Sequence, residues 1–131
     1  MERLPYIDEH VITVDADRAA TWSALLRLWV RDPTDPSTVR SPFFWLDEAV
    51  DRERLALCGE HPFSVYKLVF DLDDEGPGRT RMSARSWARF PGISGQAYQM
   101  AVIGTGAHRV AVRLLLKRIA AQAVRPPTAV A

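Results

Sequence analysis

The sequence contains a single cysteine, Cys58, among its 131 residues. One cysteine excludes an intramolecular disulfide and any metal or redox motif built on paired cysteines, so we expect a reducing compartment, the cytoplasm. No apolar run approaches the roughly 18 residues that a membrane-spanning helix requires, and charged residues interrupt the N-terminal segment. We therefore expect neither a membrane span nor a signal peptide.

Acidic residues are missing from the C-terminal part of the chain. All 16 lie at or before Glu75, whereas the 17 basic residues divide almost evenly between the two parts. The asymmetry fits either a basic surface for nucleic acid or an acidic partner, or two parts that pack together and compensate each other. Because the basic residues are not interleaved with aromatic ones as in a nucleic-acid platform, we favour compensation and expect no nucleic-acid binding.

The length and the 47% hydrophobic content suit one domain that buries its own core. A strand is expected at Tyr6–Val14, followed by a helix capped by Asp15 or Asp17 that ends near Val30. Trp22, Leu25, Leu26 and Trp29 recur there at helical spacing. The proline-containing segment 31–42 predicts a loop with at most one short turn.

Period-two alternation predicts four further strands, at 43–50, 53–60, 63–72 and 79–90, joined by short connections and therefore antiparallel. A long helix is expected from Ser94 to about Gln122, roughly 40 Å in length. The pair Pro126-Pro127 would stop it. We therefore expect a single domain over 1–122 and a flexible tail over 123–131.

The alternation places Tyr66 and the small residues Ala84 and Ser86 on the face of the sheet that meets the core. On the expected long helix, Gly104 and His108 share the buried stripe, while Arg109, Arg113 and Lys117 form a flank that faces away. Small residues on both partners imply either close approach of the helix to the sheet or a cavity between them.

His108 has two interpretations. It is a core histidine bonded to a buried hydroxyl such as that of Tyr66 or Ser64, or it contacts a ligand or transfers a proton in a pocket. His61 is interpreted as a turn residue that could also lie at the rim of a site, and His10 as a strand residue without an evident partner. The pattern does not favour a metal site, and it contains no recognisable nucleophile motif.

Three segments carry a resemblance to a known family: HVITVDADRAATW at 10–22, FPGISGQAY at 90–98 and IGTGAH at 103–108. They are similar to the first strand and helix, the end of the sheet and the final helix of the SRPBCC superfamily, which includes START lipid-binding domains and polyketide cyclases. The resemblance implies an α+β helix-grip fold, in which a curved antiparallel sheet of about five or more strands wraps around a long C-terminal helix. The fuller fold has seven strands and a second helix after the first strand, where this chain has the segment 31–42.

The resemblance also implies a hydrophobic cavity between sheet and helix, and so a protein that binds a small, largely apolar molecule without a cofactor. The candidate lining residues are Tyr66, Ala84, Ser86, Tyr98, Gly104 and His108. A polyketide cyclase or dehydratase with His108 as general acid or base is the second hypothesis, and a protein that binds a partner through its basic face is the third. The sequence does not determine the oligomeric state.

Overall fold

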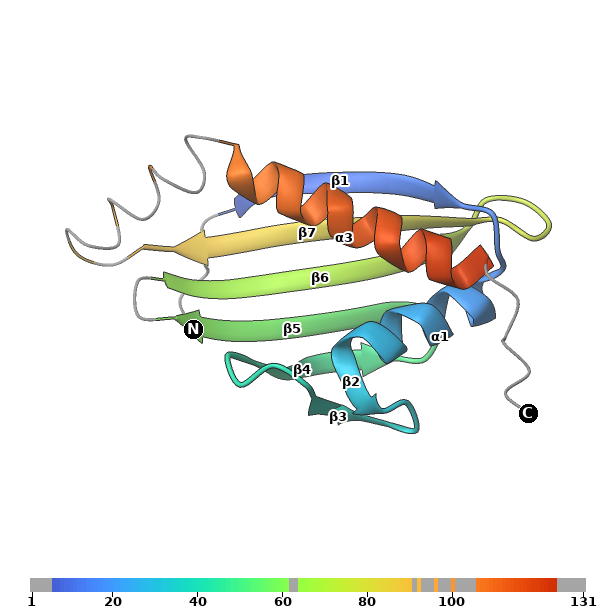
Figure 1. Cartoon of the computed structure of the whole chain (residues 1–131), viewed down its shortest axis with the longest axis horizontal. Helices are drawn as coiled ribbons and strands as arrows, with labels where there is room; N and C mark the ends of the chain where they lie inside the picture. The colour runs from blue at the N-terminus through green and yellow to red at the C-terminus, as the bar shows by residue number, and fades with distance from the viewer. Residues whose placement is uncertain are drawn as a thin grey trace.

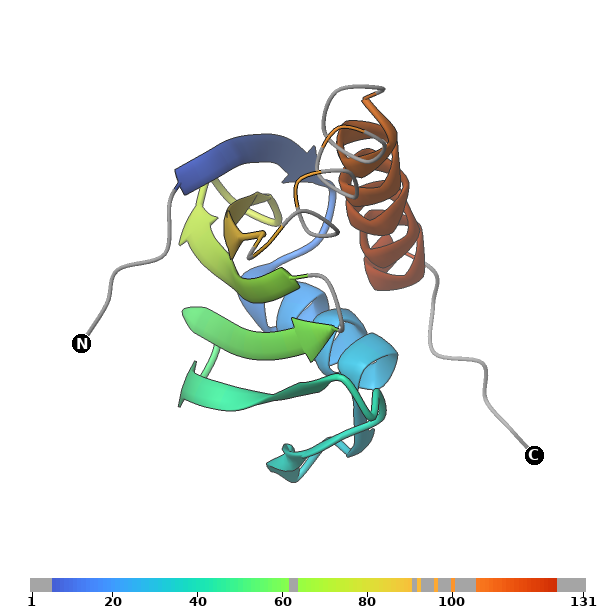
Figure 2. The same cartoon turned by 90° about the vertical axis from the view of Figure 1, so that its left-hand side faces the viewer.

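The computed structural model describes residues 6–61, 64–90, 92, 96, 100 and 106–124. The elements in chain order are β1 (Tyr6–Val14), α1 (Arg18–Trp29), β2 (Val30–Asp32), β3 (Asp35–Val39), β4 (Phe44–Val50), β5 (Arg54–His61), β6 (Ser64–Asp74), β7 (Thr80–Arg89) and α3 (Ala107–Val124). Figure 1 shows α1 and α3 crossing the strands, and Figure 2 shows that both helices lie on the same face of the sheet. We call this face the inner face.

Five strands form one open antiparallel sheet in the order β1-β7-β6-β5-β4. The predicted strands at 6–14, 43–50, 53–60, 63–72 and 79–90 are confirmed to within two residues at each end. The predicted parity is also confirmed, because Phe70, Met82 and Ala84 are fully buried on the inner face. The architecture is the expected α+β arrangement of an antiparallel sheet and a C-terminal helix.

The prediction of a loop at 31–42 is wrong, because β2 and β3 form a separate two-stranded hairpin there. Asp32 stabilises the turn, since its Oδ1 accepts hydrogen bonds from the backbone and side chain of Thr34 at 2.9 and 2.7 Å. These bonds lower the pKa of the Asp32 carboxyl, the side-chain bond having the larger effect. Pro33 lies in the turn itself, where a missing N–H costs little.

Helix α1 is confirmed with Asp17 as its N-cap. The Asp17 carboxylate accepts a hydrogen bond from the backbone N–H of Ala20 at 2.8 Å, and the helix ends at Trp29 with Val30 as C-cap. The long helix from Ser94 is not confirmed as one element, because α3 begins at Ala107. Gly106 has φ of +77°, a conformation that an α-helix cannot contain. The 18 residues of α3 span about 27 Å.

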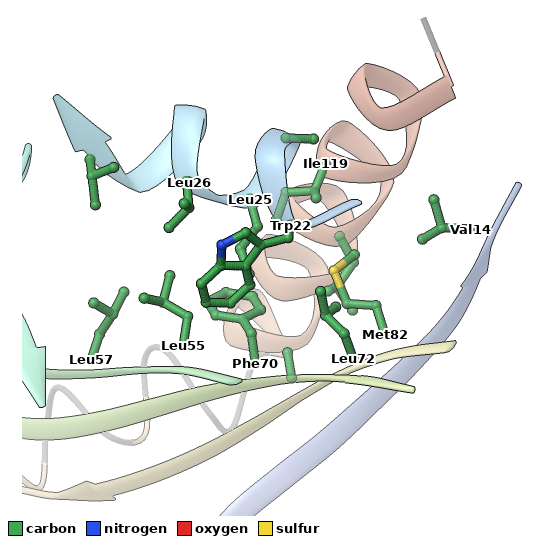
Figure 3. Packing of buried hydrophobic residues seen from close by; sticks show 14 of the residues in the cluster. Val14, Trp22, Leu25, Leu26, Leu55, Leu57, Phe70, Leu72, Met82 and Ile119 are labelled. Carbon is green, nitrogen blue, oxygen red and sulfur yellow. The ribbon is translucent and has the colours of Figure 1, made fainter. Parts of the chain in front are cut away.

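The hydrophobic core lies between the inner face and the two helices. Figure 3 shows Trp22 and Leu25 of α1 and Ile119 of α3 pointing toward the side chains of the sheet. The sheet contributes Leu55, Phe70, Leu72 and Met82, each at most 2% exposed. Sheet and helices are thereby fixed to each other at one half of the inner face. Among the described residues, no helix has the length and apolarity needed to cross a membrane.

The opposite, outer face of the sheet carries a row of alternating charges that crosses all five strands. Its members, from one edge to the other, are Glu9, Arg85, Asp71, Arg54 and Glu48. Asp71 joins two of the cations, with Arg54 Nε at 2.7 Å from its Oδ1, and it raises the pKa of Arg54 through this bond and its charge. Arg85 of β7 is thus paired with two acidic residues of the first part of the chain, as the compensation hypothesis predicts.

Candidate functional site

The edge strand β1 contributes polar side chains to the inner face. Its register with β7 pairs Asp8 with Ser86 and His10 with Ala84. Residues that are paired directly across two strands point to the same side of the sheet. Asp8 and His10 therefore lie beside residues that the sequence placed at the candidate site, although neither was predicted to belong to it.

His108 contacts strand β1 through the side chain of Asp8. Located in the first turn of α3, it places its Nε2 at 3.4 Å from Asp8 Oδ1. The other carboxylate oxygen of Asp8 lies 3.1 Å from His10 Nε2, within hydrogen-bond distance. The side chains of Asp8, His10 and His108 are only 18%, 12% and 19% exposed. One carboxylate thus lies between two imidazoles at the edge of the inner face.

The contact between Asp8 and His108 is close enough for an ion pair, but its geometry does not form a hydrogen bond. Both Asp8 Oδ1 and His108 Nε2 are buried and have no hydrogen-bond partner within the described residues. The expected alternative of a bond from His108 to the hydroxyl of Tyr66 or Ser64 is therefore not formed at this nitrogen. Nothing in the local sequence joins position 8 to position 108, although Asp8 shares the parity of the inward residues of β1.

Three further buried polar atoms in the described part of the chain lack a hydrogen-bond partner: Ser64 Oγ, Ser86 Oγ and Trp29 Nε1. Ser64 and Ser86 are 1% and 4% exposed. Native proteins pair most buried polar groups, so each exception requires an explanation. All five unpaired atoms belong to the inner face or to the two helices that cover it: those of Asp8, Ser64 and Ser86 to the strands, that of His108 to α3 and that of Trp29 to α1.

Four aromatic rings contact one another on the inner face and on helix α1. Trp29 of α1 meets Phe44 of β4 edge to face at 5.4 Å, and Phe44 stacks on Tyr66 at 6.3 Å between ring centroids. Tyr66 in turn meets Phe90 edge to face at 6.5 Å. These rings join α1 to β4, to β6 and to the residue that follows β7, and they form an apolar surface next to the core. Such apolar surfaces with a few polar groups are typical of small-molecule sites.

Of the six predicted lining residues, the structure describes four. Tyr66, Ala84 and Ser86 share the inner face, and His108 approaches it from α3. Ala84 is fully buried within the core cluster. Tyr98 and Gly104 lie outside the described residues, so the cavity expected beside Gly104 stays a prediction. His61 ends β5 opposite Ser64, at the expected hairpin, and its side chain is likewise outside the described set.

The described residues include no cluster of three His, Cys, Asp or Glu side chains placed to hold a metal ion. Cys58 is on the outer face beside Lys67, and burial is the main reason that the pKa of its thiol is raised. The nearby Asp47 carboxylate raises it further, while Lys67 lowers it. A thiol held protonated in this way is a poor nucleophile.

The surface of the described part of the chain has hollows on both sides of the sheet edge, of which two are large. One, of about 620 Å³, is on the outer face and is lined mainly by charged residues, including Glu48, Arg54 and Asp71. The other, of about 410 Å³, is a groove between β1 and α3. Neither is lined by Tyr66 or Ser86.

Comparison with known proteins establishes the fold. No protein-family model and no curated protein match the sequence. Among solved structures, the ZhuI aromatase/cyclase from Streptomyces sp. R1128 is 15% identical, with a TM-score of 0.63 over 97% of this chain and 98% of that chain. The Bacillus halodurans protein BH1534 is 18% identical, with a TM-score of 0.63 over 94% of this chain and 99% of that chain.

A START superfamily protein from Mycobacterium smegmatis is 10% identical, with a TM-score of 0.58 over 87% of this chain and 97% of that chain. The matches extend over nearly the full length of each partner, so the similarity concerns the whole domain. At these identities the likeness is one of fold. The chain therefore has the START-like, polyketide cyclase-like helix-grip fold, and the resemblance to the SRPBCC superfamily is confirmed at that level.

Proposed function

We propose that this protein binds a small, largely apolar molecule against the inner face of its sheet, with Asp8 and His108 as the polar anchor. One observation carries the proposal: Asp8 Oδ1 and His108 Nε2 are buried, adjacent and without hydrogen-bond partners in the described part of the chain. Buried polar groups left unpaired cost about 1 to 3 kcal/mol each. A ligand that pairs with both atoms removes this cost.

The chemistry of the anchor suits a hydroxyl group. A hydroxyl can donate to Asp8 Oδ1 and accept from an N–H at His108 Nε2, and the 3.4 Å between these atoms lets one oxygen lie near both. Ser86, the neighbour of Asp8 across the strands, offers a second hydroxyl. The apolar body of the ligand would lie on the aromatic rings of Phe44 and Tyr66. The proposed ligand is therefore an apolar, ring-containing molecule with at least one hydroxyl.

A cyclase or dehydratase activity is the second candidate, and the contact between Asp8 and His108 is the observation that favours it. A carboxylate beside an imidazole can orient the ring and stabilise its charged form during proton transfer. One of the solved structures that share the fold is an aromatase/cyclase. In this candidate His108 is the general acid or base and Asp8 is its positioning residue.

The substitution His108→Gln separates the two candidates. Glutamine approximately keeps the size and hydrogen-bonding ability of histidine but cannot transfer a proton near neutral pH. A binding protein keeps its affinity to within about threefold, whereas an acid-base catalyst loses roughly 100-fold or more in rate. Unchanged turnover of a substrate by the variant would exclude His108 as the catalytic group.

The third hypothesis, a partner that binds the basic face, has less support, because Arg85 and Arg79 are each paired with acidic residues of the same chain. The proposed function itself is tested by native mass spectrometry of the purified protein. We expect a noncovalent adduct of small-molecule mass that disappears on denaturation and yields a hydroxyl-bearing apolar compound. If the protein is purified without an adduct and takes up no such compound from a mixture offered to it, the proposal is wrong.

A further inference from the structure

We propose that the groove between β1 and α3 is a second binding site, which takes an amphipathic anion: a carboxylate or phosphate ester attached to an apolar chain. The groove has a volume of about 410 Å³ and is lined by Glu9, His10, Val11, Ile12, Arg113, Leu116 and Lys117. Figure 1 shows α3 passing obliquely over β1, the edge strand of the sheet. The volume is within the range of known small-molecule sites.

The floor of the groove is apolar. Leu116 of α3 is 2% exposed and Ile12 of β1 packs against the core beside it, while Val11 is 44% exposed at the rim. Four consecutive residues of β1, from Glu9 to Ile12, line the groove, so it opens along the free edge of the strand. An extended alkyl chain fits such a surface, because it can lie along the strand and bury apolar area.

One wall of the groove is positively charged. Arg113 and Lys117 are one turn apart on α3 and are both exposed. Neither has an ion pair or a hydrogen bond with any other described residue. Helix α3 contains no acidic residue that could neutralise them. Two unpaired cations beside an apolar floor select for an anionic head group.

The polar residues of the opposite wall already have partners. Glu9 faces Arg85 of the outer-face row at 4.0 Å, and His10 is hydrogen-bonded to Asp8 at 3.1 Å. The groove therefore has one carboxylate, which is shared with Arg85, and two cations that have no partner among the described residues. The groove adjoins the proposed anchor through the bond between His10 and Asp8, but neither Ser86 nor Tyr66 lines it, so this inference does not require the proposed function.

The experiment compares two double variants of equal charge by isothermal titration calorimetry with octyl phosphate and with octanoate. Arg113→Gln with Lys117→Gln removes the cations of the groove, while Arg109→Gln with Arg118→Gln removes two exposed cations of the same helix that do not line it. We expect the first pair to weaken binding by roughly tenfold or more and the second by less than about twofold. The better of the two probes identifies the head group as a phosphate or a carboxylate.

Backbone amide shifts in NMR spectra locate the binding. Octyl phosphate should shift residues 9–12 and 113–117, and inorganic phosphate and octanol should bind much more weakly, because each lacks half of the recognised structure. Equal weakening by both double variants would overturn the proposal, as would shifts confined to Ser64 and Ser86. Octyl phosphate tests the groove, whereas neutral apolar probes test the inner face. Either proposal can therefore fail without the other.

Discussion

Leucine in place of Ser86 is expected to weaken the binding of N-phenyl-1-naphthylamine, a neutral aromatic probe, by roughly tenfold or more. Ser86 is 4% exposed on the inner face, between Asp8 and Leu68 of the neighbouring strands. The larger side chain would occupy the volume that the proposal assigns to the ligand. The free energy of unfolding should change by about 1 to 3 kcal/mol, depending on how full the site already is.

The matched control is Ser83→Leu, three residues away on the same strand. Ser83 pairs with Val11 and Asp71, so its side chain points to the outer face. Probe fluorescence should titrate for this variant as it does for the wild-type protein. Equal losses of affinity in the two variants would mean that the probe does not bind at the inner face. If Ser86→Leu loses its far-UV circular dichroism and so does not fold, Ser86→Val takes its place.

The substitution Asp8→Ala is expected to have the second large effect, because it removes the carboxylate between two imidazoles. The hydrogen bond to His10 at 3.1 Å is lost, and the protein should be less stable to urea by about 1 to 3 kcal/mol. The wild-type protein should also bind 1-naphthol more tightly than 1-methylnaphthalene, a probe of similar shape without the hydroxyl. The variant should lose this preference, which we expect to be about fivefold.

Glu9→Ala is the control for Asp8→Ala. Glu9 is the next residue on β1 and faces Arg85 on the outer face at 4.0 Å. A half-exposed pair at this distance contributes less than about 1 kcal/mol. If Asp8→Ala keeps the preference for 1-naphthol while Glu9→Ala loses it, the hydroxyl is recognised elsewhere.

Much of this fold could be predicted because its signals are local. The alternation from Tyr6 to Val14, the capping oxygen of Asp17 and the inward parity of Met82 and Ala84 depend on neighbouring residues alone. The hairpin of β2 and β3 does not follow from the sequence, because the prolines of this segment indicate a loop. Thr38 Oγ1 accepts the backbone N–H of Asp32 at 2.9 Å and so supports a pairing that propensity does not favour.

The candidate site could be predicted only in part. The sequence placed Tyr66, Ser86 and His108 toward one another from periodicity, but the partner of His108 depends on tertiary packing. Asp8 lies 100 residues before His108, and only the pairing of β1 with β7 and the course of α3 bring the two together. The break at Gly106 does not follow from the sequence either, because an internal glycine is tolerated in many helices and only the positive φ shows that a new helix begins after it. The cytoplasmic location stays a prediction.

The most direct test of the central claim is to map the binding of 1-naphthol on the ¹⁵N-labelled protein by NMR. Our account predicts that the largest amide shifts occur at Asp8, Ser86 and His108, with a change in the imidazole signals of His108. These shifts should be smaller with 1-methylnaphthalene. Saturable binding that leaves Asp8, Ser86 and His108 unshifted and instead shifts residues of the outer face would contradict the account.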